Sequence, residues 1–406
     1  MRIALVHDHL VQDVGAENVL LALQEVFPNA PTFTLLYDPK RVSGAFASRD
    51  IRTSFLQSLP FALKKYQWML PLMPAATEAH DLSQFDVIVS SSSAFAKGVI
   101  TRPGAVHICY CHTPTRYLWS DTHSYVQELR APRLLKLGLP MLLNKLRVWD
   151  RLSADRVDRF IANSETVAGR IRKYYDRSSD VIHPPVETEK FSMSGKPGTY
   201  FLAGGRLVSY KRFDLIIQAF NRTGLPLKIF GDGPLAAAYR KIARSNIEFT
   251  GKVDDEAKAE LYRNAIAFIH PQEEDFGITA LESMASGRPV IAYRKGGALE
   301  TVVEGVTGEF FDDQEWEELA TAVIRFDASR YDARAIRAHA EAFDVRTFKR
   351  RIAAYVAEAW KAARTGQATD RPLVIPSEAE GSIHRIPIDS STPRRSARYD
   401  KIDQPA

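Results

Sequence analysis

The sequence predicts an α/β protein of two doubly wound domains that face each other across a cleft. Strand-like apolar runs alternate with helical patterns from the start of the chain, and the alternation restarts near residue 199 after a polar stretch. The chain has 406 residues, which is too long for one hydrophobic core. Parallel sheets built in this way bind ligands beyond the carboxyl ends of their strands. The functional residues are therefore expected in the cleft.

The first domain is expected over residues 1–186, followed by a linker over residues 187–198. Short apolar runs between helical patterns are typical of buried parallel strands. In this domain they lie at Ile3–Val6, Phe33–Leu36, Val87–Val89, Ile108–Tyr110 and Phe160–Ala162. The stretch 187–198 is polar and contains serine, glycine and proline, which is typical of a connection between domains.

The second domain is expected over residues 199–342. Its strands are predicted at Tyr200–Ala203, Leu227–Phe230, Ile247–Phe249, Ile266–Ile269 and Val290–Tyr293, with helices near residues 212–221, 235–244, 255–264 and 278–286. Apolar residues at helical spacing predict a terminal helix within residues 343–365. Residues 366–406 have scattered proline and little periodicity, so we expect a disordered tail that is inessential to chemistry.

Composition excludes several classes of protein. The 54 Lys and Arg against 49 Asp and Glu give a net charge of +5, too small for a surface that binds nucleic acid throughout, so no nucleic-acid partner is expected. The only cysteines, Cys109 and Cys111, exclude a disulfide scaffold and favour a reducing compartment. The amino-terminal segment turns polar too early for a signal peptide, and no run of about 18 uncharged apolar residues occurs. A soluble or peripheral cytoplasmic protein is expected.

The segment from Glu274 to Glu282 carries the richest chemistry. It follows an apolar strand and opens a predicted helix, and Gly277 allows a close approach of the backbone. The free amides at the start of that helix and the positive end of its dipole form an anion site suited to a diphosphate. The two acids lie at different depths, so one can hold a sugar and the other a ribose. In the alternative, Glu274 or Asp275 caps the helix and Glu282 is solvated.

Two glycine turns follow the first two strands of the second domain. Arg206 and Lys211 follow the first strand and can clamp phosphate oxygens, although exposed cations after a strand often meet only solvent. The segment Gly231–Ala236 fits a dinucleotide-binding pattern, but it follows the second strand of its domain, and Pro234 suits a plain helix start equally well. A structural turn is favoured there.

In the first domain, Gly15 and His112 lie near the ends of predicted strands at the cleft. Gly15 can bring the backbone up to a ligand, although a plain turn is the alternative. His112 can contact a substrate or serve as a structural hydrogen-bonding group. A zinc site is disfavoured, because Cys109, Cys111 and His112 lie too close together to complete a tetrahedral set.

Residues 130–151 and 60–74 are apolar segments interleaved with basic residues. The first combines leucine, methionine and Trp149 with Arg133, Lys136, Lys145 and Arg147. The second contains Lys64, Lys65, Trp68 and Leu70. Such segments bind the surface of anionic membranes, and the alternative is a core helix with a solvated basic face.

Taken in order, seven motifs resemble the retaining family 4 glycosyltransferases of the GT-B fold. The motifs are Gly15–Glu17, Cys111–Arg116, Gly205–Lys211, Gly231–Pro234, Glu274–Glu282, Gly287–Ala292 and Gly296–Glu300. The resemblance covers roughly residues 1–360 and is strongest to bacterial mannosyltransferases of surface-polysaccharide assembly. It implies two Rossmann-like domains that close on a nucleotide sugar, and a last helix that packs back onto the first domain.

The resemblance also assigns roles by matching positions. Arg206 and Lys211 would bind the diphosphate, and Glu282 the ribose. Glu274, with the amides of Phe276 and Gly277, would hold the donor sugar. The remaining positions are Gly15 near the diphosphate, Val253 at the base and His112 near the reacting carbon. One departure is Val14, where many family members carry a second glycine.

The implied reaction is transfer of a hexose with retention of configuration. The leading donor is GDP-mannose, with UDP-sugars as the alternative, and the acceptor is a lipid-linked or glycan molecule of surface-polysaccharide assembly. No Asp-x-Asp pair occurs, so no metal or other cofactor is expected. An inner membrane surface is an expected partner through residues 60–74 and 130–151. A nucleotide-sugar epimerase, a glycan phosphorylase or a non-catalytic nucleotide-sugar sensor remain the competing classes.

Overall fold

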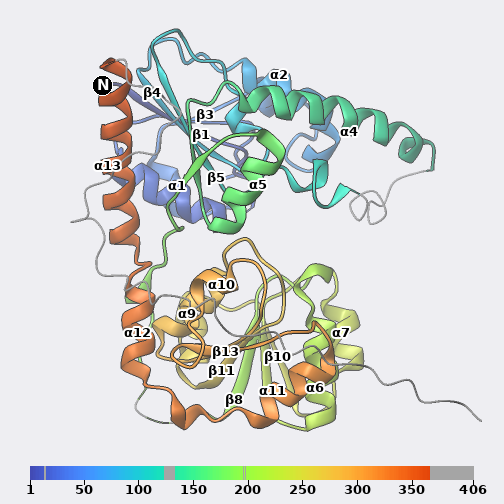
Figure 1. The fold of residues 1–406 in the computed structure, drawn as a ribbon. Helices are drawn as coiled ribbons and strands as arrows, with labels where there is room; N and C mark the ends of the chain where they lie inside the picture. Colours follow the sequence, from blue (N-terminus) through green and yellow to red (C-terminus); the bar gives the residue numbers. More distant parts are fainter. Residues whose placement is uncertain (13–14, 123–132, 195, 197, 366–406) are drawn as a thin grey trace, which may run out of the picture.

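The computed structural model describes residues 1–12, 15–122, 133–194, 196 and 198–365, with side chains left out at residues 133–137. These residues form two α/β lobes, one above the other in Figure 1. The prediction for the tail, residues 366–406, lies outside the described residues, as does the departure at Val14.

The first lobe is built on a parallel sheet in the order β3-β2-β1-β4-β5-β6-β7. Its strands are β1 (Ile3–His7), β2 (Thr32–Thr34), β3 (Ile51–Thr53), β4 (Val87–Ser92), β5 (Val106–Cys111), β6 (Arg159–Ala162) and β7 (Ser179–Val181). Strands β4 and β5 are buried along their whole length, as helices on both faces require. The change of direction in strand order lies between β1 and β4, which is where such a sheet binds its ligand.

The second lobe repeats this plan with the parallel order β10-β9-β8-β11-β12-β13. Its strands are β8 (Tyr200–Gly204), β9 (Leu227–Phe230), β10 (Ile247–Gly251), β11 (Ala265–His270), β12 (Val290–Tyr293) and β13 (Gly308–Phe311). The direction changes between β8 and β11. The loops that follow these two strands carry Arg206, Lys211 and Glu274, so the topology brings the predicted donor residues to one place.

Helices cover both sheets. In the first lobe and the terminal return they are α1 (Gly15–Val26), α2 (Met73–Glu78), α4 (Arg133–Ala154), α5 (Glu165–Tyr175) and α13 (Val345–Arg364). In the second lobe they are α6 (Phe213–Thr223), α7 (Ala236–Ile242), α8 (Asp255–Arg263), α9 (Ile278–Ala285), α10 (Ala298–Thr301), α11 (Trp316–Arg325) and α12 (Ala333–Glu341).

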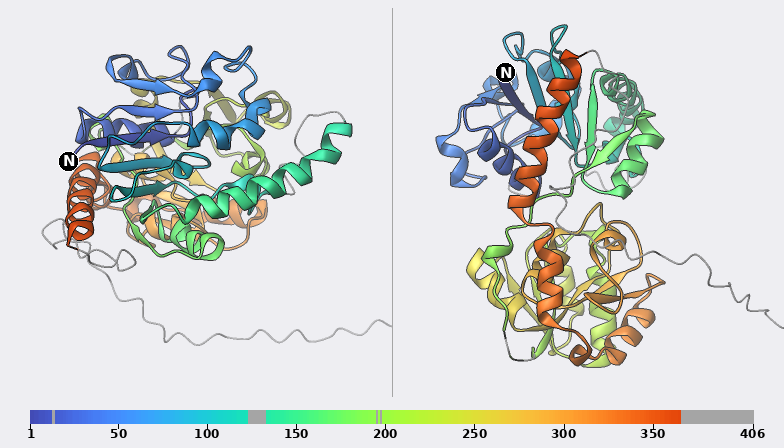
Figure 2. Two further views of the ribbon diagram at one scale, coloured as in Figure 1. Left: turned by 90° about the horizontal axis from the view of Figure 1, so that it is seen from above. Right: turned by 60° about the vertical axis from the view of Figure 1, so that its left-hand side comes forward.

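The last helix returns to the first lobe, as the resemblance implies. Figure 2 shows α13 running alongside that lobe while α12 lies on the other one. Five α13 side chains enter the core formed by β1, β4, β5 and α1; they are Phe348, Ile352, Tyr355, Val356 and Ala359. The two chain crossings between the lobes are pinned together, because Val186 N donates to Phe343 O at 3.1 Å and Val345 N donates to Val186 O at 2.9 Å.

Three strands were absent from the sequence prediction, and no range was predicted for several helices, among them α1, α5, α10, α11 and α12. Strands β3 and β7 have three residues each, and neither is fully buried, so they leave no apolar run to find. Strand β13 lies at the edge of its sheet, and two of its four residues are only partly buried. Helices α11 and α12 were not predicted, although each buries an apolar stripe, with Leu319 and Val323 in α11 and Ile336 in α12. The expected strand Phe33–Leu36 begins and ends earlier, as β2, because its partner β1 ends at His7, which pairs with Thr34.

Candidate functional site

The loop between β11 and α9 is held in position by glycines on both sides. Gly277 precedes α9 with φ of +91°, a conformation that L side chains rarely adopt. The neighbouring loop contributes Gly296 and Gly297, where an added Cβ would lie 2.4 Å from the Glu274 carbonyl oxygen and 2.3 Å from Phe276 Cα, respectively. Gly297 N also donates to Glu274 O at 2.8 Å. The backbone of the predicted donor-sugar loop is therefore fixed by close packing.

Lys211 and Glu274, predicted as separate donor contacts, form an ion pair of 2.7 Å between Nζ and Oε1. The two side chains are only 12% and 16% exposed. Burial opposes the charge of each group, but Lys211 brings the pKa of Glu274 down to about 2, and Glu274 in turn raises the pKa of Lys211. Both groups therefore remain charged at neutral pH, beside the start of α9.

His270, at the end of β11, is a site residue that sequence reasoning missed. Its side chain is fully buried, and its Nε2 atom has no hydrogen-bond partner within the described part of the chain. Nε2 lies 4.0 Å from Glu274 Oε2, and a Cβ added at Gly277 would lie 3.2 Å from it. Burial lowers the pKa of His270, so a neutral ring faces the loop. Its position directly before the acidic loop could have identified His270 from the sequence.

The glycine turns after β8 and β9 pack against each other. A Cβ at Gly231 would lie 2.0 Å from the Gly205 carbonyl oxygen, and one at Gly233 would lie 2.4 Å from the Leu207 carbonyl oxygen. This crowding explains why glycine is required at these two positions without any ligand. It agrees with the prediction of a structural turn rather than a dinucleotide-binding site. Arg206 between the turns is exposed, and no ion-pair partner for it occurs among the described residues.

Glu282 lies in the second turn of α9 and is held by two neighbours on α8. Lys258 Nζ contacts Oε1 at 2.9 Å, and the Tyr262 hydroxyl donates to Oε2 at 3.0 Å. Glu282 also lines a cavity of about 550 Å³ between the lobes, whose wall includes residues of α1, the linker and α13. A carboxylate fixed in this way can accept hydrogen bonds from the hydroxyls of a ligand in that cavity.

The starts of α1 and α9 lie beside each other. Gly15 begins α1, and a Cβ added there would lie 3.5 Å from Ile278 Cδ1. Gly15 thus lies next to the start of α9, where the diphosphate site is predicted. A side chain there would take up part of the space between the two helix starts.

His112, directly after β5, belongs to a buried polar chain. Its Nε2 atom lies 2.8 Å from Ser91 Oγ, which lies 3.1 Å from His7 Nδ1. Burial lowers the pKa of His112 to about 4 and that of His7 to about 3. Both rings are neutral near pH 7, so His112 can donate or accept a hydrogen bond but brings no charge. Sequence reasoning missed His7, although it ends the first strand.

Asp8, which directly follows His7, fixes the start of the loop after β4. Its two carboxylate oxygens accept hydrogen bonds from the amides of Ser93, Ala94, Phe95 and Ala96 at 2.6 to 3.0 Å. The pKa of Asp8 is lowered despite burial, with His7 and these amides as the causes. An acid directly after the first strand was visible in the sequence.

A cavity of about 430 Å³ opens in the first lobe next to these residues. Its wall combines hydrogen-bonding and apolar side chains from the loops after β1, β4 and β5 and from residues 66–73. Polar members include His9, Gln12, Gln67, Arg116 and Tyr117, and apolar members include Leu35, Leu70, Met73 and Phe95. The cavity lies on the predicted acceptor side of the cleft.

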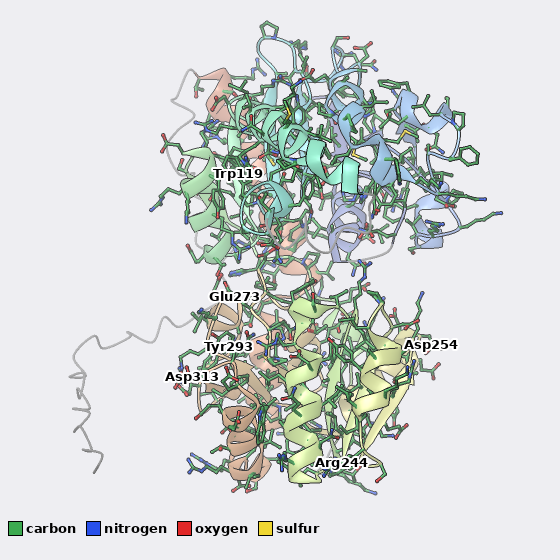
Figure 3. The ribbon with its side chains drawn as sticks, turned by 90° about the vertical axis from the view of Figure 1, so that its right-hand side faces the viewer. Trp119, Arg244, Asp254, Glu273, Tyr293 and Asp313 are labelled. Carbon is green, nitrogen blue, oxygen red and sulfur yellow. The ribbon has the colours of Figure 1, made fainter. Side chains whose placement is uncertain are left out.

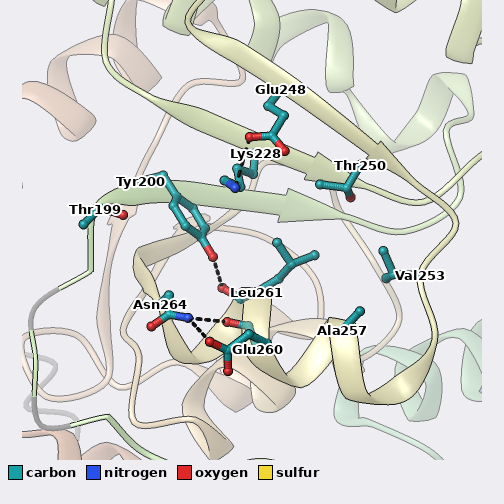
Figure 4. Close-up of a pocket in the computed structure, with 10 residues that line it drawn as sticks. All are labelled: Thr199, Tyr200, Lys228, Glu248, Thr250, Val253, Ala257, Glu260, Leu261 and Asn264. Atoms are coloured by element: carbon teal, nitrogen blue, oxygen red, sulfur yellow. Dashed lines mark hydrogen bonds and ion pairs between the residues drawn. The ribbon is translucent and has the colours of Figure 1, made fainter.

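Val253 lines a different hollow, of about 540 Å³, beside α8. Figure 4 shows Val253 where the strands end and Thr199 at the opposite end of the hollow. The middle is polar, with Lys228 Nζ 3.0 Å from Glu248 Oε2. Val253 follows strand β10, at the sheet edge where the other donor residues are predicted, whereas Thr199 precedes strand β8 at the opposite edge.

Across the cleft, Glu300 on α10 caps the start of α5 in the first lobe. Its carboxylate accepts from Glu165 N at 2.8 Å and from Thr166 N at 3.1 Å. Asp275 in the acidic loop pairs with Arg116 and Arg170 of the first lobe. Figure 3 shows Glu273, beside this loop, at the edge of the second lobe that faces the first, and Arg244 at the far end. The predicted catalytic loops therefore meet at the interface.

Neither a metal site nor a membrane span is found among the described residues. No group of three or more His, Cys, Asp or Glu side chains within them has the arrangement to hold a metal ion. None of their helices is sufficiently long and apolar to cross a bilayer.

Comparisons with known proteins agree with this architecture. A family model described as Glycosyltransferase Family 4 matches residues 15–190, and one described as Glycosyl transferases group 1 matches residues 186–342. The structure resembles that of HepE from Anabaena in complex with UDP and glucose, with a TM-score of 0.64 and 18% identity over 88% of this chain and 99% of that chain.

Curated relatives include two named mannosyltransferases. The alpha-1,3/1,6-mannosyltransferase ALG2 of Dictyostelium discoideum is 24% identical over 76% of this chain and 85% of its own length. A GDP-mannose-dependent alpha-mannosyltransferase of Corynebacterium glutamicum is 35% identical over 31% of each chain. Alignments with several other relatives span about half of the relative's length.

The fold and these matches define the protein as a glycosyltransferase with the GT-B architecture. Together the two family models cover residues 15–342 without a gap. The chain belongs to glycosyltransferase family 4.

Proposed function

We propose that the protein transfers mannose from GDP-mannose, with retention of configuration, to a lipid-linked or glycan acceptor of cell-surface polysaccharide assembly. The observation that carries the proposal is the buried Lys211–Glu274 pair at the start of α9, with His112 on the first-lobe side of the same cleft. Mannose leads because the relatives named mannosyltransferases include one described as GDP-mannose-dependent.

In this proposal the second lobe binds the donor. Lys211 and the exposed Arg206 contact the diphosphate together with the free amides at the start of α9, and Gly15 allows it to lie close to α1. The ribose hydroxyls donate to Glu282, which Lys258 and Tyr262 hold in place. Val253 borders the base.

The donor sugar contacts Glu274 and the amides of Phe276 and Gly277. As the bond to the diphosphate breaks, negative charge grows on the leaving oxygen, and Lys211, Arg206 and the helix start stabilise it. The acceptor hydroxyl enters on the face that the diphosphate leaves and gives its proton to a phosphate oxygen. Because the acceptor attacks on this same face, no carboxylate nucleophile is needed. Neutral His112 would hydrogen-bond the sugar near the reacting carbon.

We infer that this chemistry needs no metal ion. The positive charge that a divalent cation would supply comes from Lys211, Arg206 and the helix amides. Transfer that persists in excess chelator, at the rate found with magnesium, tests the inference directly.

The acceptor side favours an amphiphilic substrate. Residues 61–73, here called the rim segment, line the first-lobe cavity with Tyr66, Gln67, Leu70 and Met73. The same segment exposes Phe61 by 72% and Trp68 by 66%. A sugar head in the cavity would therefore leave a lipid chain next to exposed apolar side chains, with basic Lys64 and Lys65 beside them.

The rim segment and α4 form one surface. Their buried faces share a core that includes Leu56, Leu70, Leu143 and Leu146. Met141 on α4 is 71% exposed, and Lys145 is exposed as well. Arg147 instead donates to the Leu118 carbonyl at 2.7 Å, so it supports the lobe. We place this surface on the cytoplasmic face of a membrane.

The test begins with the donor. Thermal shift with GDP, UDP and ADP identifies the base, since a ligand at about 100 times its Kd adds roughly 2.7 kcal/mol of stability. The protein is then incubated with GDP-mannose and a bacterial lipid extract. Release of GDP together with an α-linked mannosyl lipid is expected, and Glu274→Gln is the inactive control. Stabilisation by UDP alone would replace the donor, and a changed sugar without acceptor would indicate an epimerase.

A further inference from the structure

Two consecutive acids of the loop after β11 point to different lobes. Glu274 pairs with Lys211 in its own lobe. Asp275 crosses the cleft, where its Oδ1 atom lies 2.7 Å from Arg116 and also contacts Arg170. Arg116 follows His112 by four residues on the acceptor side of the cleft. We propose that Asp275, Arg116 and Arg170, here called the clasp, are positioning residues that hold the acceptor-side loop and the donor-sugar loop in register for transfer.

The clasp is poorly exposed. The side chains of Asp275, Arg170 and Arg116 are 16%, 21% and 30% exposed. Removing one partner of a shielded ion pair costs more than removing one partner of an exposed pair, because the remaining charge is left without compensation. Arg170 also donates to Thr113 Oγ1 at 3.3 Å, so it links the clasp to the residue after His112.

The first-lobe residues of the clasp are held in place by hydrogen bonds to Asp150. Asp150 of α4 accepts from Thr115 Oγ1 at 2.7 Å, from Trp119 Nε1 at 2.8 Å and from the Tyr175 hydroxyl at 2.9 Å. Lys97 completes the network at 2.5 Å, with both members of the pair 1% exposed. Thr115 and Trp119 flank Arg116, and Tyr175 ends the helix that carries Arg170. One buried carboxylate therefore fixes both arms of the clasp.

The second-lobe side is equally constrained. Asp275 stands between Glu274 and Phe276, and the Phe276 ring stacks on His183 with centroids 5.1 Å apart. His183 also lies 3.3 Å from Glu300, the residue that caps α5. The electrostatic influence of Asp275 reaches His112, whose pKa it raises against the larger lowering by burial. Asp275 directly follows Glu274 and pairs with Arg116, in the loop that follows His112. A displacement of Asp275 would therefore move the Glu274 backbone relative to His112.

This inference rests on the proposed transfer reaction, and its test separates the two. Asp275→Asn removes the charge, and Glu273→Gln is the matched control, because Glu273 is 46% exposed and lies 3.9 Å from Arg170. For Asp275→Asn we expect kcat to fall about 10- to 100-fold while nucleoside-diphosphate affinity changes less than about twofold. For Glu273→Gln we expect both quantities to stay near those of the wild type.

A double-mutant cycle tests whether the residues act together. Arg170→Met alone should lower kcat as Asp275→Asn does, and it should cost little more in the Asp275→Asn background. Arg170→Lys, which keeps the charge, should recover part of the loss. Multiplicative losses in the double variant would overturn the clasp as a unit.

A measurement without turnover completes the test. Spin labels at Lys40→Cys and Lys241→Cys, both exposed and in different lobes, report the distance between the lobes, since Cys109 and Cys111 are buried. Asp275→Asn should broaden the distance distribution, and Glu273→Gln should not. An unchanged distribution, or an unchanged kcat, in Asp275→Asn overturns the proposal. If the wild type transfers no sugar, the proposed function fails while the label distances still decide whether the clasp holds the lobes.

Discussion

The ammonium group of Lys211 rests 2.7 Å from the carboxylate of Glu274, so two residues assigned to different parts of the donor neutralise each other before any donor is bound. The pair has no net charge, yet it keeps the buried ammonium group of Lys211 beside the start of α9. An incoming diphosphate would share Lys211 with Glu274. The proposed donor site would thus be preorganised by its own side chains.

Lys211→Ala should weaken nucleoside-diphosphate binding and slow transfer. The substitution removes a charge-assisted contact worth about 1.5 to 3 kcal/mol and leaves Glu274 buried without its partner. Calorimetric titration with the diphosphate measures the change. Lys241→Ala, at an exposed lysine of the same lobe, is the control and should bind normally. Normal turnover in Lys211→Ala would remove the diphosphate assignment.

The two acids of the donor site should fail in different ways. Glu282→Gln should chiefly raise the KM for the donor, because the contact that we propose between Glu282 and the ribose would be the same before and during reaction. Glu274→Gln should chiefly lower kcat, since its contact lies next to the reacting sugar. Steady-state kinetics for both variants test this division. Equal effects on kcat and KM in the two would contradict it.

The free energy of unfolding should fall as the pH drops from about 6.5 towards 4. Burial lowers the pKa of His107 and of His112 to about 4, so the folded state holds these rings neutral while the unfolded chain protonates them. Their stabilisation is complete above pH 6.5 and is lost as the pH falls through that range, by about 1–2 kcal/mol per ring at pH 5.

Urea denaturation at pH 7.5, 6 and 5 measures this slope. His107→Gln removes one titrating ring outside the proposed catalytic site and should flatten the dependence. A slope that is the same in the variant and the wild type would show that His107 does not contribute.

Lys97→Met should destabilise the first lobe strongly. The change removes the cation from a buried pair and leaves Asp150 charged in the interior, which typically costs about 3–5 kcal/mol. Lys40→Met, at an exposed position, should change the urea midpoint little. A midpoint for Lys97→Met equal to that of the wild type would mean that water or the remaining donors satisfy Asp150.

Liposome binding should depend on the rim segment. Phe61→Ser with Trp68→Ser should reduce pelleting with anionic vesicles, because both side chains are largely exposed and apolar. Ile324→Ser, which removes a side chain 66% exposed in the second lobe, is the matched control. Binding should also weaken with salt through Lys64 and Lys65. Equal pelleting of all three proteins at low salt would assign the contact elsewhere.

The sequence predicted the fold, and it predicted that the loops carrying Lys211 and Glu274 meet at one edge of the second sheet, because the signals for both are local. The strand ending at Ile269, the glycine at position 277 and the acids on either side of it lie within a few residues of each other. Alternation of strands and helices is likewise a local pattern. These features predict the sheet edge at which Lys211 and Glu274 meet.

Other parts of the site depend on contacts between distant residues. Asp150 is about 35 residues from Thr115, and Asp275 is more than 100 from Arg170. Nothing in the spacing of such residues marks them as partners. The short strands β3 and β7 were missed for a related reason, since their pairing depends on neighbours and their own sequences are hardly apolar.

The return of α13 to the first lobe bears on the order in which the chain folds. Phe348, Ile352 and Tyr355 complete a core whose other members, such as Leu5 and Leu20, are made at the beginning of synthesis. We therefore expect the core of the first lobe to be completed only after more than 340 residues have been made. The second lobe is continuous in sequence and can close earlier. When the chain is made from its amino terminus, the second lobe can therefore be completed before the first.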